Sequence, residues 1–66
     1  MQIQVNGAPM TVDEDLSVEA LLRQCGLEQS VCAVEVNEDL VPKSNHAGRA
    51  LREGDHVEIV TLVGGG

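Results

Sequence analysis

The chain has 66 residues, no Phe, Tyr or Trp, and a net charge of −7 from 4 Lys plus Arg and 11 Asp plus Glu. Such a length holds one small domain with a simple aliphatic core, which argues against a deep pocket with its own catalytic machinery. The acidic balance argues against nucleic acid as a partner, because that affinity comes from clustered cations. It favours an acidic carrier that docks on a basic enzyme surface.

The first predicted element is a β-hairpin. Apolar and polar residues alternate over residues 2–6, which is typical of a half-buried strand. Asn6-Gly7 then favours a type I′ turn, because both residues tolerate a positive φ. Met10 and Val12 continue the alternation in a second antiparallel strand, and Pro9 predicts that this strand starts at an edge or a bulge.

An amphipathic helix is predicted to follow, from about Val18 to Cys25. Ser17 is placed to cap its N-terminus, and Gly26 to end it. The acidic residues 13–15 form a solvated turn before it, since they lack the spaced oxygen ligands of a calcium loop. A helix this short needs a sheet to cover. Its apolar residues recur at the spacing i, i+3, i+4, i+7: Val18, Leu21, Leu22 and Cys25.

The remaining elements are strands joined by turns and one irregular segment. Residues 31–36 alternate as a third strand, with Glu35 on the solvent side. Residues 40–42 read as a short strand stopped by proline, and residues 43–52 as an irregular segment with one helical turn near Ala47. After a turn at residues 53–55, the last strand runs from Val57 to Val63.

This order of elements predicts an α+β fold in which one helix crosses a mixed sheet of four or five strands. The first and last long strands pair in the middle of that sheet, as in the ubiquitin-like β-grasp fold. We therefore expect one β-grasp domain over residues 1–63, followed by a flexible glycine tail at residues 64–66.

The side chains that could perform catalysis are few. His46 and His56 are the only general bases near neutral pH, and we expect both on solvent-exposed loops. Cys25 and Cys32 are expected to be reduced, structural thiols. No spacing resembles a metal site, and the N-terminus lacks a basic secretion signal, so we expect a cytoplasmic protein without a bound metal.

The terminal glycines Gly64-Gly65-Gly66 allow two interpretations. They are either a frayed end or an arm whose terminal carboxylate another protein can reach. They are not a phosphate loop, because no helix and no Lys-Ser/Thr follow them, so any nucleotide must be held by a partner. If the carboxylate of Gly66 attacks the α-phosphorus of ATP, a mixed anhydride with AMP results, and sulfide or an amine can then displace AMP.

Three segments together resemble the ThiS-type sulfur carriers: residues 1–7, residues 33–37 with Val41-Pro42, and residues 54–66. The likeness covers essentially the whole chain. It implies a β-grasp fold, adenylation of Gly66 by a ThiF-like enzyme that uses ATP, and conversion to a thiocarboxylate. It also implies that a sulfur donor system supplies the sulfur and that a ThiG-like thiazole synthase receives it to build the thiazole of thiamine.

In this resemblance the carrier is a protein cosubstrate and not an enzyme, with no cofactor of its own. Gly66 is the acyl site, and Gly64 and Gly65 thread the active site of the partner. Gly64 exceeds the minimal terminal diglycine, and its role stays open. Three alternatives also stay open: a related MoaD-type carrier for molybdopterin synthesis, a ubiquitin-like protein modifier, and a plain interaction domain with an idle tail.

A docking surface is predicted from the last strand. If Val57 and Ile59 face the core, Val60 and Leu62 lie on the open face of the sheet beside Ala33. Grouped apolar side chains of this kind suggest a partner surface, and an anchor near the tail limits the freedom lost when the tail enters an enzyme. The alternative is that Val60 and Leu62 are ordinary exposed residues of a strand.

Overall fold

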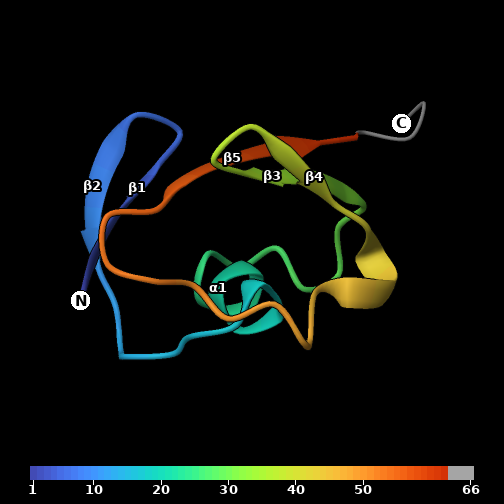
Figure 1. The fold of residues 1–66 in the computed structure, drawn as a ribbon. Helices are drawn as coiled ribbons and strands as arrows, with labels where there is room; N and C mark the ends of the chain where they lie inside the picture. Colours follow the sequence, from blue (N-terminus) through green and yellow to red (C-terminus); the bar gives the residue numbers. More distant parts are fainter. Residues whose placement is uncertain (63–66) are drawn as a thin grey trace.

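The computed structural model describes residues 1–62. Its strands form one sheet in the order β2-β1-β5-β3-β4, and α1 lies across one face of that sheet (Figure 1). This arrangement confirms the predicted β-grasp fold. The elements are β1 (Gln2–Val5), β2 (Ala8–Thr11), α1 (Val18–Gln24), β3 (Cys32–Val36), β4 (Asp39–Val41), the 3₁₀ turn η1 (Lys43–Asn45) and β5 (His56–Thr61).

The sheet is mixed because its two central strands run parallel. β1 pairs with β5 in parallel, with Val5 opposite Val57, whereas the other neighbouring pairs are antiparallel. The hairpin between β1 and β2 turns at Asn6 and Gly7, whose φ angles of 52° and 84° fit the predicted type I′ turn. β2 is an edge strand, so Pro9 removes no ladder hydrogen bond that the sheet needs.

The helix begins and ends as its capping residues predict. The hydroxyl of Ser17 accepts from the backbone N–H of Ala20 at 3.0 Å. At the other end Gly26 has a φ of 75°, and the N–H of Leu27 donates to the carbonyl of Leu22 at 2.8 Å, which is a Schellman ending.

The prediction that Cys25 belongs to the buried helix face is wrong, because its thiol-bearing side chain is exposed. Cys25 is the C-cap, one residue beyond the last helical residue, so the periodicity of the helix no longer applies to it. The Schellman ending instead returns Leu27 to the core, where it lies partly buried. The chain therefore closes this end of the core with a loop leucine.

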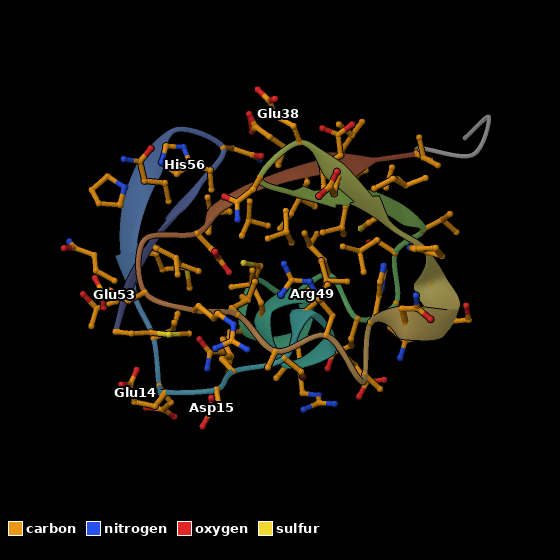
Figure 2. The ribbon with its side chains drawn as sticks, in the orientation of Figure 1. Glu14, Asp15, Glu38, Arg49, Glu53 and His56 are labelled. Atoms are coloured by element: carbon orange, nitrogen blue, oxygen red, sulfur yellow. The ribbon has the colours of Figure 1, made fainter. Side chains whose placement is uncertain are left out.

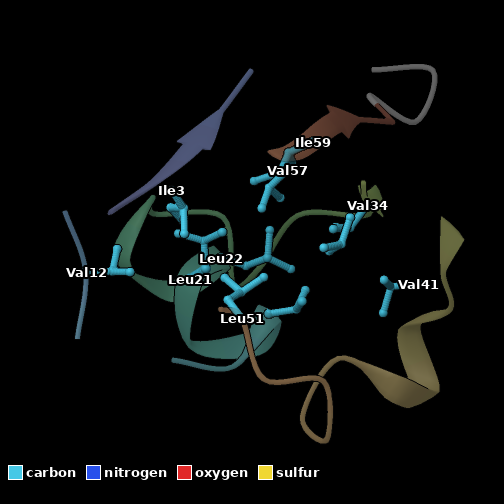
Figure 3. Close-up of a cluster of buried hydrophobic side chains, with 11 residues drawn as sticks. Ile3, Val12, Leu21, Leu22, Val34, Val41, Leu51, Val57 and Ile59 are labelled. Carbon is cyan, nitrogen blue, oxygen red and sulfur yellow. The ribbon is translucent and has the colours of Figure 1, made fainter. Parts of the chain in front are cut away.

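The core lies between α1 and the sheet (Figure 3). Alternate residues of the strands meet helix residues three or four apart there, because side chains alternate between the faces of a strand and repeat about every 3.6 residues around a helix. Burial of this aliphatic surface is the main favourable contribution to folding, at roughly 25 cal/mol per Å². The buried cluster contains Ile3, Val12, Val18, Leu21, Leu22, Val34, Val36, Val41, Leu51, Val57 and Ile59.

The segment between η1 and β5 covers the N-terminal end of α1. The carbonyls of Arg49 and His46 accept from the N–H groups of Val18 and Glu19 at 2.9 and 3.0 Å. The N–H groups in the first turn of a helix have no acceptor within the helix, and this segment supplies acceptors for two of them. The helical turn predicted near Ala47 falls slightly earlier, in η1 (Lys43–Asn45).

His46 is buried as a result, with 7% of its surface exposed, and the prediction of an exposed loop histidine is wrong for this residue. Its Nε2 donates to the carbonyl of Val41 at 3.0 Å. His56 is exposed as predicted, although it begins strand β5 and is not in a loop. Within residues 1–62, α1 is too short to span a membrane.

Candidate functional site

The predicted acyl site lies beyond the described residues. Gly66, with Gly64 and Gly65, lies outside residues 1–62, and so does Val63, the predicted end of the last strand. The structure describes the segment that leads to these residues. The N–H of Leu62 donates to the carbonyl of Val31 at 2.7 Å, and Thr61 pairs with Cys32 at the start of β3. The sheet therefore holds the chain in place up to Leu62.

Asn6 fixes the position of β5 from the other side. Its side-chain carbonyl accepts from the N–H of Ile59 at 2.7 Å, and its side-chain amide donates to the carbonyl of the same residue at 3.2 Å. This pair of bonds continues the β1–β5 ladder past the end of β1. One turn residue therefore serves both the first hairpin and the strand that carries the tail.

A second polar network anchors the start of β5. The carboxylate of Asp55, buried at 8% exposure, accepts from the side-chain amide of Asn37 at 3.0 Å and from the backbone N–H of Arg52 at 2.8 Å. The side chain of Asn37 in turn accepts from the N–H of His56 at 3.0 Å. These bonds join the β3–β4 turn to the segment that enters β5.

The predicted docking residues lie where the alternation of β5 places them. Val57 and Ile59 are buried beneath the sheet, whereas Val60 and Leu62 are 58% and 52% exposed. Ala33 stands directly opposite Val60 across the β3–β5 pairing.

The structure adds Leu40, which is 66% exposed and which sequence reasoning missed. Leu40 stands opposite Glu35, which is two residues along β3 from Ala33, so it is diagonal to that alanine on the same face. We call the side of the sheet away from α1 the open face; its members discussed below are Ala33, Glu35, Leu40, Glu58 and Val60.

Charge is distributed unevenly between the two sides of the sheet. Within residues 1–62, none of the five strands contains Lys or Arg. Arg49 lies on the helix side of the sheet, and Glu38 is at the tip of the β3–β4 turn (Figure 2). Glu35 and Glu58 stand directly opposite one another on the open face. The chain's four Lys and Arg residues lie on α1, on η1 and in the segment before β5: Arg23, Lys43, Arg49 and Arg52.

The helix side contains a groove of about 260 Å³ whose lining includes Leu22, Cys32 and His46. The groove brings Cys32 and His46 to one place, which their sequence spacing did not predict. Their contacts do not form a thiol–imidazole pair: the Sγ of Cys32 is 3.9 Å from the carbonyl of Ser30, and the Nε2 of His46 is bonded to Val41. Among residues 1–62 there is also no group of three or more His, Cys, Asp or Glu that could hold a metal ion.

The likeness to known proteins extends past residue 62 to the end of the sequence. The model of the ThiS family matches residues 3–66. The chain is similar to the crystal structure of a thiamine biosynthesis protein (ThiS) from Geobacter metallireducens, with 35% identity, a TM-score of 0.84 and full coverage of both chains. It is 29% identical to the sulfur carrier protein ThiS of Escherichia coli over the full length of both.

The chain is also 41% identical to part of a thiazole synthase from Paramagnetospirillum magneticum. All 66 residues are matched, but they span only 20% of that longer protein. The family match over nearly the whole chain and the full-length structural likeness agree with the fold, the strand order and the predicted resemblance. This chain belongs to the ThiS family.

Proposed function

We propose that this protein is a sulfur carrier of thiamine biosynthesis and that the carboxylate of Gly66 carries the sulfur. The observation that carries the proposal is the family match, which continues through the terminal glycines to residue 66. The names of the full-length relatives, a thiamine biosynthesis protein and a sulfur carrier protein, support it.

The chemistry is confined to the terminal carboxylate and proceeds on partner enzymes. A carboxylate oxygen of Gly66 attacks the α-phosphorus of ATP on a ThiF-like adenylating enzyme, and pyrophosphate leaves. Sulfide sulfur from the donor system then attacks the acyl carbon and displaces AMP, which leaves a thiocarboxylate. A ThiG-like thiazole synthase takes up this sulfur. The carrier itself supplies position and reach.

The position of the segment that leads to the terminal glycines supports a docking role for Val60, Leu62 and Ala33. Four residues follow Leu62 in the sequence, and four extended residues span at most about 14 Å. A partner must therefore bring its active site within that distance of Leu62. The exposed apolar side chains of Leu62 and its neighbour Val60 are close enough to the tail to bind that partner. Gly64 and Gly65 suit a passage into its active site that is too narrow for side chains.

Intact-mass measurement tests the proposal. The purified protein is incubated with its cognate adenylating enzyme, ATP and a sulfide source. We expect a gain of about 16 Da, the difference between sulfur and oxygen at the activated acyl carbon. Omission of ATP and deletion of all three terminal glycines, residues 64–66, are the controls, and both abolish the gain.

An unchanged mass in the complete system refutes the proposed function. Isopeptide adducts on lysines of other proteins, without a thiocarboxylate, favour the modifier alternative instead. Sulfur transfer to molybdopterin synthesis in place of thiazole synthase favours the MoaD-type alternative.

A further inference from the structure

Glu35 and Glu58 form an unfavourable pair in the free protein. They are direct cross-strand partners of β3 and β5, and both are exposed. Like charges directly opposite one another in an antiparallel pair are destabilising. The ion pairs formed within residues 1–62 are Met1 with Glu14 and Arg23 with Glu19, so neither carboxylate of the Glu35/Glu58 pair has a cationic partner there.

The neighbours of this pair toward β4 and toward Val60 are apolar, whereas His56 lies two residues before Glu58 on the same side of β5. Leu40 stands opposite Glu35 on β4, and the Ala33/Val60 pair is the next outward-facing pair along β3 and β5. The Lys and Arg residues of the chain lie on other elements, so within residues 1–62 the five strands place no lysine or arginine beside the two carboxylates. A partner that covers the apolar residues must therefore meet two adjacent negative charges, and a cation is what they accept.

A relative indicates which partner this is. In the thiazole synthase of Paramagnetospirillum magneticum, a segment 41% identical to this entire chain is part of the same polypeptide as the remaining four fifths of the protein. Two units that are covalently joined in one organism are held at high effective concentration, which favours an interface between them. A second copy of this chain is a poor occupant, since each copy has a net charge of −7.

We propose that the open face docks on thiazole synthase, and that Glu35 and Glu58 together receive one cationic side chain of that enzyme while Leu40, Ala33 and Val60 bury against apolar surface beside it. This inference rests on the proposed function. An arginine suits the position best, because its planar guanidinium can bond both carboxylates at once. The repulsion within the free carrier is then relieved in the complex.

The test measures the Kd between the carrier with a free carboxylate and its cognate thiazole synthase. The variants are Glu35→Gln, Glu58→Gln and the double variant, and Glu28→Gln is the matched control with the same change of charge on the loop after α1. We expect each single variant to weaken binding about tenfold and to reduce its salt dependence, because a charge-assisted contact is lost. The control stays within about twofold of the parent protein.

The double variant shows whether one cation is shared. If both carboxylates hold the same side chain, the double variant weakens binding by less than the product of the two single effects. Multiplied effects, or single variants that match Glu28→Gln, overturn the proposal. The proposal is also overturned if the single variants lose affinity only for the adenylating enzyme. It is overturned as well if the carrier self-associates and Glu58→Gln abolishes that self-association.

Stability of the free carrier gives an independent readout. Each single variant should raise the urea midpoint slightly, because removal of one charge relieves the cross-strand repulsion. Weaker binding together with higher stability is the expected combination, whereas a lower midpoint in both variants overturns it. The mass gain of about 16 Da is scored separately, so failure of the sulfur chemistry and failure of the docking inference are distinguishable.

Discussion

The two sides of strand β5 have different roles although they alternate along the same six residues. Val57 and Ile59 point toward α1 and are buried, whereas Glu58 and Val60 point away from it and are exposed. The buried side contributes stability, and the open side contributes little to the core. One short strand therefore supports the fold with its buried side and, in the proposed docking, presents its exposed side to a partner, so the two sides can be changed separately.

The matched substitutions Val57→Ala and Val60→Ala test this comparison most directly. Both remove the same atoms from β5, but Val57 is 2% exposed and Val60 is 58% exposed. We expect Val57→Ala to lower the free energy of unfolding by about 2–3 kcal/mol, through lost burial and the cavity left behind. Urea denaturation measures both variants. Similar losses for the two would mean that the open face also stabilises the fold.

Removal of the Asp55 carboxylate tests whether β5 depends on its polar anchor as well as on its core side. Asp55→Ala leaves the N–H of Arg52 and the side-chain amide of Asn37 without their acceptor. We expect a loss of about 1–2 kcal/mol in the free energy of unfolding, because the polar groups left behind are partly buried. Asp39→Ala, at an exposed position of β4, is the control and should change little. Equal effects for both variants would contradict the network.

The helix that covers the buried side depends on its cap. Ser17→Ala removes the acceptor of the Ala20 N–H, and we expect a loss of about 1 kcal/mol. Thermal unfolding followed by circular dichroism measures it. Ser30→Ala in the loop before β3 is the matched control, since its hydroxyl caps no helix. If Ser17→Ala has no effect, the carbonyls of Arg49 and His46 are enough to satisfy the end of the helix.

The smallest effect is expected on the open face. Leu40→Ser replaces an exposed leucine on the edge strand β4, and we expect the free energy of unfolding to change by no more than about 0.5 kcal/mol. The same variant should weaken binding to thiazole synthase, because Leu40 belongs to the proposed docking surface. A large loss of stability together with unchanged binding would reverse the assignment of the two faces.

Local rules explain why much of the fold was predictable. The Asn6-Gly7 turn, the Ser17 cap and the Gly26 ending each depend on the φ or the hydrogen bonding of a few neighbouring residues. His46 and Cys25 were predicted wrongly for the opposite reason. The burial of His46 requires residues 43–50 to fold over α1, and Leu27 enters the core where Cys25 was expected. The sequence periodicity contains no information about either of these packing arrangements.

For the candidate site too, some features followed from the sequence and others only from the tertiary structure. The amino-acid sequence by itself determined that Val60 and Leu62 oppose the core side of the last strand, because side chains alternate with a period of two. Through the family resemblance it also predicts that the carboxylate of Gly66 is the reactive group, a prediction that lies outside residues 1–62. Only the tertiary structure decided that Leu40 is diagonal to Ala33 and that Glu35 faces Glu58. Those neighbours come from the register of different strands, two of which are far apart in the chain, and register is set by how all the strands pack against α1 together.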